Sequence, residues 1–429
     1  MLPLLGRLLH HRWLQVGMGV KRWLLLLMVG ITAISLGVAY ILRDLYLTWV
    51  FSPTAYVLTL QFLPRPVRGF LLGSFGLGLV ILAIYQLSHS LLAAFVHPGQ
   101  EDIAEVVYRY RQRGRGPKVV AIGGGTGLAV LLRGLKAHTS NLTAIVTVAD
   151  DGGSSGHLRR ELGVLPPGDI RNCLAALADD EALLTQLFQY RFSQGAGLDG
   201  HAFGNLFIVA MAGVTGDFDR AILESSRVLA VQGRILPSTL DRVTLCADLR
   251  EEAGQLGRVE GESRIPLARL PIERVFLKPH HVRAYPEAIR AILEADLICI
   301  GPGSLYTSVL PNLLVEDITR ALCAARAPRV YICNVATQVG ETEGYDLSDH
   351  LAALWTHGTR DCFTHVLAND NLTVPTPPDW PIALVSPRCP SSGAGYRIVT
   401  KDVIDPENPW RHDPYKLARA LMAIHTEVS

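Results

Sequence analysis

Residues 119–138, VVAIGGGTGLAVLLRGLKAH, join a short apolar run to a helical pattern through a glycine-rich turn. The β-branched run VVAI is typical of a buried strand, and the apolar residues after the turn recur at helical spacing. A strand that leads directly into a helix is the repeating unit of α/β folds with a parallel sheet. This stretch therefore predicts the first strand–turn–helix unit of such a domain.

Similar short apolar runs recur along the chain and end in glycine, aspartate or asparagine: TAIVTVADD (143–151), DLICIGPG (296–303) and RVYICNV (329–335). Helical patterns fall between them, and strand signals fade over roughly 165–235. The sequence therefore predicts a Rossmann-like α/β domain over residues 118–429, with a parallel sheet, helices on both faces and a helical insertion.

Two long apolar stretches precede this domain. Residues 23–41 carry no charge and are long enough to cross ~30 Å of hydrocarbon as a helix. Residues 70–96 are also apolar, although polar residues interrupt them near the end. We expect residues 1–96 to form a transmembrane helical hairpin; the alternative is a single span followed by an interfacial helix.

Basic residues flank both stretches on the outside, which predicts a multi-pass protein of the cytoplasmic membrane with both termini and the α/β domain on the cytoplasmic side. Residues 97–117 start acidic and end basic, which predicts a linker helix. The arginines of this segment could contact the headgroups of the lipid bilayer, or they could simply be exposed to water.

The bulk composition excludes several classes of protein. A formal net charge of +1 gives no sign of a nucleic-acid partner. The seven cysteines form no CxxC pair and lie mostly in apolar runs, so they predict buried thiols in a reducing compartment, without a disulfide framework or zinc site.

Two glycine turns are the strongest candidates for a ligand site. The first holds Gly123, Gly124, Gly125, Thr126 and Gly127, and the second holds Gly301, Gly303 and Ser304. Each follows a predicted strand and opens a predicted helix, where free N–H groups and the helix dipole favour an anion. The first turn matches neither GxGxxG nor a Walker A loop, which disfavours a dinucleotide oxidoreductase. Together the two turns predict a site for a diphosphate.

The run VADDGGSSGHLRREL, residues 148–162, adds charged and hydroxyl groups after the second predicted strand. Asp150 and Asp151 are paired carboxylates of the kind that hold Mg²⁺. Ser154 and Ser155 offer hydroxyls, and Arg159 offers a forked donor to phosphate. The alternative is an Asx-type turn with a helix cap at Ser155.

Further polar residues extend the candidate ligand site: Arg171, Asn172, His201, Asn205, Asn334 and Thr337. A structural hydrogen-bond partner explains Asn205 as well as a ligand does, and ordinary turn formation is the alternative for Asn334 and Thr337. Helix capping is the favoured interpretation of Asp169. No nucleophile motif is present, and no tightly held organic cofactor is expected.

The motifs GGGTGLAVLLRGLK, TAIVTVADDGGSSGHLRRELGVLPPGDIRNCLAAL, GHAFGNL, GPGSLYTSVLPNLL and CNVATQVGET together resemble the YvcK family of bacterial gluconeogenesis factors. These are relatives of CofD, the 2-phospho-L-lactate transferase. By motif, the resemblance places the family's phosphate turns at residues 123–127 and 301–304, its metal-facing acid at Asp150 or Asp151, and its His–Asn helix at His201 and Asn205.

The resemblance implies a regulatory protein that binds a UDP-type nucleotide sugar and supports cell shape and wall morphogenesis during gluconeogenic growth. The alternative that it implies is a Mg²⁺-dependent transferase that moves a phospholactyl-type group from a guanylyl diphosphate donor to a deazaflavin. The sequence leaves open whether the chain forms a homo-oligomer, and whether it catalyses any reaction.

Overall fold

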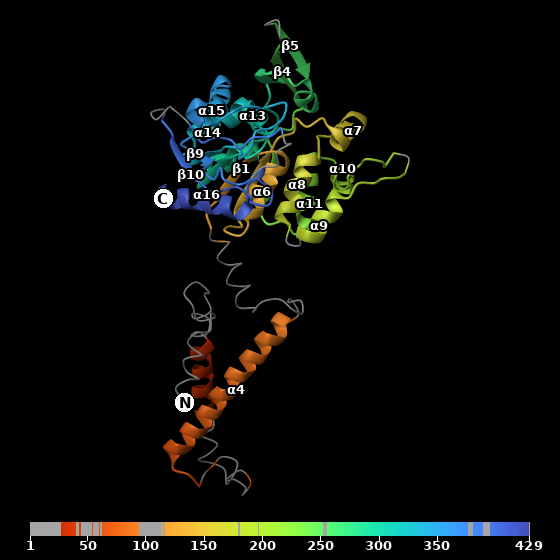
Figure 1. The fold of residues 1–429 in the computed structure, drawn as a ribbon. Coiled ribbons are helices and arrows are strands. Elements are labelled where there is room, and N and C mark those ends of the chain that lie inside the picture. The colour runs from red at the N-terminus through yellow and green to blue at the C-terminus, as the bar shows by residue number, and fades with distance from the viewer. Residues whose placement is uncertain are drawn as a thin grey trace. The chain divides into compact units, whose positions relative to one another are not determined.

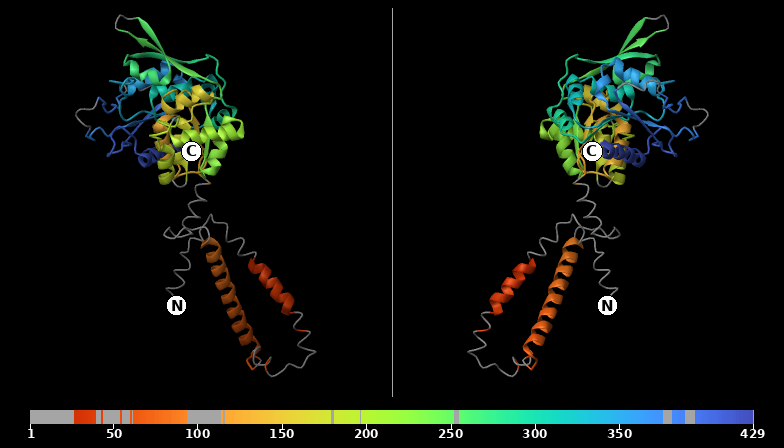
Figure 2. Two further views of the ribbon diagram at one scale, coloured as in Figure 1. Left: turned by 90° about the vertical axis from the view of Figure 1, so that its right-hand side faces the viewer. Right: turned by 90° about the vertical axis from the view of Figure 1, so that its left-hand side faces the viewer.

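The computed structural model describes residues 27–39, 43, 54, 60, 62–93, 114, 116–178, 181–195, 197–251, 255–375, 381–388 and 395–428. The chain divides into two compact units, Met1–Gln112 and Arg113–Ser429 (Figures 1 and 2). All strands among the described residues, and the candidate site, belong to the second unit.

A seven-stranded sheet in the order β10-β9-β8-β7-β1-β2-β3 forms the centre of the second unit, and each neighbouring pair is parallel. From β1 the chain adds strands outward on one side and then returns to add β7 to β10 on the other. The switch point of a doubly wound sheet therefore lies between β1 and β7. The strands are β1 (Val119–Gly123), β2 (Leu142–Val146), β3 (Arg234–Pro237), β7 (Leu297–Ile300), β8 (Arg329–Ile332), β9 (His365–Asn369) and β10 (Arg397–Lys401).

Both faces of the sheet are covered, because alternate side chains of β1 enter two separate cores. Val120 and Ile122 belong to one core, and Val119 and Ala121 to the other. Helices on the first face are α12 (Pro286–Leu293), α14 (Glu316–Ala324) and α15 (Leu347–Thr356). Helices on the second face are α6 (Gly125–Leu135), α8 (Gly168–Leu177) and α16 (Pro414–Val428). The predicted parallel α/β architecture is confirmed.

The expected helical insertion lies between β2 and β3. It consists of α7 (Gly153–Leu162), α8, α9 (Glu181–Gln189), α10 (Phe203–Thr215) and α11 (Phe218–Val228). The sequence did not predict the antiparallel sheet β5-β4-β6, which stands at the edge of the body in Figures 1 and 2. Its strands are β4 (Thr244–Arg250), β5 (Leu256–Glu260) and β6 (Ile272–Lys278).

Short helical turns complete the second unit. They are η2 (Glu262–Arg264), η3 (Pro266–Ala268), the π-helix η4 (Leu305–Val309), α13 (Leu310–Leu313) and η5 (Arg360–Cys362). Of these, η4 and α13 directly follow the second glycine turn, so that turn opens a single π-helical turn instead of the regular helix that the sequence predicted.

The first unit holds α4 (Arg65–Ala93). Within it, Pro66–Ile84 has a mean hydropathy of 2.0 and is the one helix among the described residues that is long and apolar enough to cross a membrane. The first predicted span is described only as the helix Leu27–Ala39, which is shorter than the ~20 residues that a span needs. The predicted hairpin is therefore not shown, and most of the predicted linker helix, residues 97–117, lies outside the described residues.

Candidate functional site

The first glycine turn connects β1 to α6 through a backbone that only glycine fits. Gly125 has a φ of 62°, in the left-handed region. A Cβ atom on Gly127 would lie 2.6 Å from the carbonyl oxygen of Pro302 in the second turn. The two turns therefore pack backbone against backbone at the switch point of the sheet.

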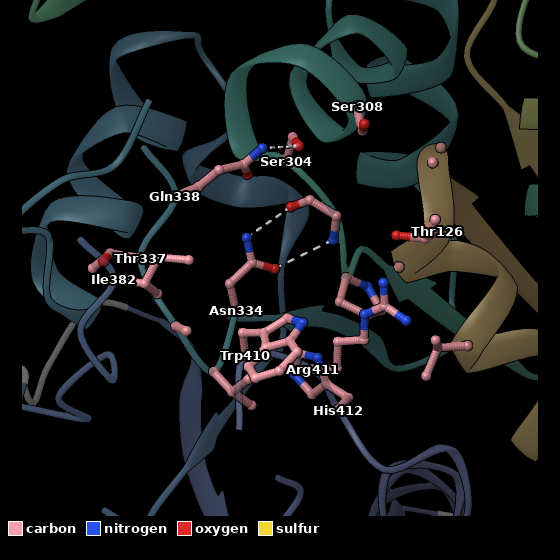
Figure 3. A pocket seen from close by; sticks show the side chains of 18 of the residues that line it. Thr126, Ser304, Ser308, Asn334, Thr337, Gln338, Ile382, Trp410, Arg411 and His412 are labelled. Carbon is pink, nitrogen blue, oxygen red and sulfur yellow. Dashed lines mark hydrogen bonds between the residues drawn. The ribbon is translucent and has the colours of Figure 1, made fainter. Parts of the chain in front are cut away.

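The second glycine turn is held in place by side chains that follow β8. The Asn334 amide donates to the Gly303 carbonyl (2.9 Å) and accepts from the Gly303 N–H (3.3 Å). Gln338 Nε2 donates to Ser304 Oγ (2.6 Å), as Figure 3 shows. Ser304 therefore does not cap η4 with its side chain. Asn334 and Gln338 fix the shape of this turn.

A pocket of about 430 Å³ opens where the two turns meet. Eight of the predicted ligand residues line it: Gly124, Gly125, Thr126, Gly127, Gly303, Ser304, Asn334 and Thr337. The Thr337 hydroxyl also accepts a hydrogen bond from the Ala383 N–H (3.0 Å), which ties it to a neighbouring segment of the same chain. The pocket thus has a lining of backbone amides and small polar groups, in a volume that suits a small-molecule ligand.

A C-terminal loop closes one side of the pocket, and the sequence analysis missed it. Trp410, Arg411 and His412 line the pocket together with Ile382 (Figure 3). Burial lowers the pKa of His412 to about 4, so its ring is neutral near pH 7. Its Nε2 lies 3.2 Å from the Cys333 carbonyl, which can only accept, so Nε2 carries the proton and holds the loop against β8.

Behind the first turn lies a carboxyl cluster, which we define as Asp150, Asp169, Glu262 and Glu341. Asp169 accepts a hydrogen bond from the Gly125 N–H, and burial together with Asp150 raises its pKa to about 7. Burial and the neighbouring acids raise the pKa of Glu262 to about 8, and burial raises that of Glu341 to about 7. The cluster favours protons or a cation at neutral pH.

The interpretation of Asp169 as a helix cap is wrong. The N-cap position of α8 is Pro167, and Asp169 lies two residues further on in the first turn of the helix, where its carboxylate accepts from the Gly125 N–H of the first glycine turn. A Cβ atom on Gly124 would lie 2.5 Å from Asp169 Oδ2. Sequence alone missed this because the contact joins two loops that are distant along the chain.

The two candidate metal residues are oriented differently. Asp150 accepts from the Gly152 N–H (2.9 Å) and from Ser155, so the Asx-type turn considered as an alternative is present. Asp151 Oδ1 accepts from both the N–H and the hydroxyl of Ser263 (2.9 and 2.8 Å). Across the described residues, no group of three or more His, Cys, Asp or Glu side chains has an arrangement that could hold a metal ion.

The cap expected at Ser155 is wrong, because Gly152 is the N-cap of α7 and Ser155 bonds Asp150. Ser154 lies in a buried hydrogen-bond network instead of the pocket. Its hydroxyl lies 3.0 Å from His201 Nδ1 and accepts from the Asn205 amide (3.0 Å). This network joins α7 to α10.

The predicted arginines also lie outside the residues that line the pocket. Arg159 donates to the carbonyl oxygens of Val243 and Asp150. Arg171 donates to the Asn172 side chain (3.0 Å), and its charge acts on Asp169 and Asp150. Gly123 and Gly301 shape the turns without lining the pocket. The structure therefore separates a pocket from a buried charged region behind it.

Known proteins resemble this chain in sequence and in fold. The sequence model of the family described as 2-phospho-L-lactate transferase CofD matches residues 119–377. A protein of Nostoc sp. described as a gluconeogenesis factor is 47% identical over 423 residues, which cover 96% of this chain and 91% of that protein. The gluconeogenesis factor of Bacillus subtilis is 47% identical to this chain. The alignment spans the whole of that protein and 73% of this chain.

A crystal structure of a Bacillus halodurans protein matches the fold. It is 45% identical to this chain and superposes with a TM-score of 0.66. The match spans the whole of that protein and 72% of this chain. The relative from Deinococcus radiodurans is 37% identical over 98% of this chain. Relatives therefore exist both with and without a counterpart to the first unit.

Proposed function

Because this chain belongs to the family of gluconeogenesis factors and carries a domain of the CofD family, we propose that its strand-end pocket binds a nucleotide sugar of the UDP type. The observation that carries the proposal is the meeting of two glycine turns over one pocket at the switch point of the sheet. Ligands of open α/β sheets bind at such a point.

The diphosphate of this ligand would lie against the first turn of α6. The N–H groups at that helix start have no partners within the helix, and the dipole there favours an anion. Among the described residues, Arg411 is the single Lys, Arg, Asp or Glu side chain that lines the pocket, so it would supply the positive charge. A guanidinium donates two parallel hydrogen bonds to phosphate oxygens.

The base and the sugar would occupy the remainder of the pocket. Trp410 and Ile382 offer apolar surface to a flat ring, and Thr126 and Ser308 offer hydroxyls. Asn334 and Gln338 would act by holding the second glycine turn, because their amides already bond Gly303 and Ser304.

We propose a Mg²⁺ ion as the counter-ion of the diphosphate. Asp150 and Asp169 fit such an ion best, since they are partly buried oxygen donors beside the first turn and their pKa values are raised. Asp151 fits less well than the sequence analysis expected, because Ser263 donates twice to its Oδ1. Mg²⁺ commonly takes one or two carboxylates and completes its shell with phosphate oxygens and water.

In the cell, we place this protein at the cytoplasmic membrane, with the α/β domain and both termini on the cytoplasmic side, where it supports cell shape and wall synthesis during gluconeogenic growth. The support is the apolar helix Pro66–Ile84 and the basic residues that flank the two apolar stretches. A bilayer anchor would hold a nucleotide-sugar sensor where wall precursors are assembled.

A second candidate function is a CofD-type transferase. The observation that favours it is the family match itself, which spans residues 119–377 and carries that enzyme's description. In this case Asp150 and Asp169 would hold the metal that clamps a guanylyl diphosphate donor. Metal-dependent consumption of such a donor with a deazaflavin acceptor would establish this function.

Thermal unfolding of the purified protein across a concentration series of UDP-glucose and UDP-N-acetylglucosamine tests the main proposal. Ligand at 100 times Kd stabilises the folded state by about 2.7 kcal/mol, so the melting temperature should rise with concentration and saturate. GDP serves as the matched comparison. A rise with GDP alone favours the transferase, and an unchanged melting temperature with all three contradicts nucleotide binding.

A further inference from the structure

Two cysteines from separate elements face each other in the second unit. Cys323 lies in the last turn of α14, and Cys362 ends η5. Their Sγ atoms are 2.8 Å apart. A disulfide bond is about 2.05 Å long, so a sulfur movement of roughly 0.8 Å would bring the two atoms to bonding distance. We propose that Cys323 and Cys362 form a reversible disulfide, with a small-molecule disulfide of the glutathione class as oxidant.

The two thiols differ in access to solvent. Cys323 is exposed, whereas Cys362 is buried beneath it. The other cysteines that the structure describes are all buried, so Cys323 is the described thiol that a dissolved disulfide can reach. The sequence analysis expected buried thiols throughout and was wrong for Cys323. Cys323 is therefore the entry thiol, and Cys362 is the resolving thiol.

The reaction proceeds by two exchanges. The Cys323 thiolate attacks one sulfur of glutathione disulfide, forms a mixed disulfide and releases one glutathione thiolate, which takes up the proton lost by Cys323. The Cys362 thiolate then attacks the Cys323 sulfur and releases the second glutathione, which takes up the proton from Cys362. Two protein thiols are oxidised, and one small disulfide is reduced to two thiols.

Burial of Cys362 works against the second exchange, because the attacking group is a thiolate. Burial and the contact with Cys323 raise the pKa of the Cys362 thiol to about 12, and Arg329 acts in the opposite direction. Arg329 Nη1 donates to the carbonyls of Leu322 and Ala325 at the end of α14 (2.9 and 2.8 Å). The guanidinium is thus fixed beside the pair, and the second exchange should become faster as the pH rises.

The bond would join α14 to η5, which lead into β8 and β9. The pair therefore lies at the amino ends of these strands, whereas the pocket lies beyond the carboxyl end of β8, at Asn334. The two cysteines are 39 positions apart, and closing that loop constrains the unfolded chain. Oxidation should stabilise the fold and leave the pocket unchanged, so this inference is independent of the proposed function.

Peptide mapping of the full-length protein tests the proposal. The reduced protein is incubated with glutathione disulfide, digested and analysed by mass spectrometry. We expect peptides that contain Cys323 and Cys362 to be linked, and the melting temperature to rise by about 5 °C and return after dithiothreitol. Glutathione that stays on Cys323 without transfer, or two thiols that remain unmodified, would overturn the proposal.

Variants separate the two steps. Cys362→Ala should leave one glutathione on Cys323, and Cys323→Ser should take up none and show no rise in melting temperature. Cys246→Ala removes a buried thiol from β4 and should behave as the wild type does. A disulfide to any other cysteine in the wild type, or an equal rise in Cys323→Ser, would contradict the assignment of this pair.

Discussion

Arg411 is exposed and lines the pocket, so its side chain can be removed without loss of core packing. A hydrogen bond to a charged group contributes about 1.5–3 kcal/mol, so Arg411→Ala should weaken UDP-sugar binding by roughly 10- to 100-fold. The melting temperature of the free protein should not change. Titration calorimetry measures the affinity.

The matched control is Arg326→Ala, which removes an exposed arginine that does not line the pocket. It should bind as the wild type does. An equal loss of UDP-sugar affinity in both variants would indicate a nonspecific effect of charge. Unchanged affinity in Arg411→Ala would place the diphosphate elsewhere.

Asp169 should make the stability of the fold depend on pH. Its pKa is about 7 in the folded protein, above the 3.8 of an ordinary aspartate. A carboxyl whose pKa rises on folding contributes stability that is fully present below pH ~4 and is lost as the pH rises through 7. Asp169→Asn keeps an oxygen for the Gly125 N–H and removes this titration.

Urea unfolding of both proteins between pH 4 and pH 8 checks this expectation. The free energy of unfolding of Asp169→Asn, relative to the wild type, should increase with pH, by at most ~4 kcal/mol. Two parallel pH profiles would show that Asp169 does not titrate as its burial implies.

Some residues of the site could be predicted from the sequence, and others could not. Glycines between a strand and a helix locate the two turns, because no other residue meets their conformational demands. Trp410 and Arg411 carry no such signal, since they lie in an irregular loop almost 300 residues from the first turn and reach the pocket only through the folded chain.

At the scale of elements, the start of α6 depends on close contact with the second turn. Gly127→Ala would place a Cβ atom 2.6 Å from the Pro302 carbonyl oxygen, and such overpacking typically costs 1–3 kcal/mol. We expect a lower melting temperature and loss of UDP-sugar binding, both measured by thermal unfolding with and without ligand.

Gly213→Ala in α10 is the matched control, because a Cβ atom there meets no other atom within 4 Å. Alanine is a better helix former than glycine, so this variant should be slightly more stable and should bind normally. If both variants bind equally well, the close approach of the two turns is not required for the ligand.

The central strands could be predicted from sequence, whereas the small sheet could not. Strands β1, β2, β7 and β8 are mostly apolar runs because helices bury both faces of the sheet. In β4 the buried Asp248 interrupts the apolar pattern. Arg258 and Arg274 pair with it at 2.9 and 2.8 Å, and such compensation is visible only in the folded chain.

At the scale of the whole molecule, the second unit should fold without the first. Removal of residues 1–112 leaves Arg113–Ser429, and a complete Bacillus subtilis relative aligns with 73% of this chain. We expect a protein that stays in solution without detergent and binds UDP-sugars with the affinity of the full chain. Cell fractionation should find the full chain, and not the truncated one, in the membrane fraction.

Two results would contradict this division. Aggregation or loss of binding on truncation would show that the first unit contributes to the fold of the second. Recovery of the full chain in the soluble fraction would remove the membrane anchor from the proposal and leave the pocket unaffected.

The most direct measurement is a crystal structure of the protein grown with a UDP-sugar and Mg²⁺. We predict the diphosphate against the backbone amides of Thr126 and Gly127, with Arg411 on its open side and the metal ion toward Asp150 and Asp169. A nucleotide bound away from both glycine turns, with this pocket vacant, would contradict the central claim.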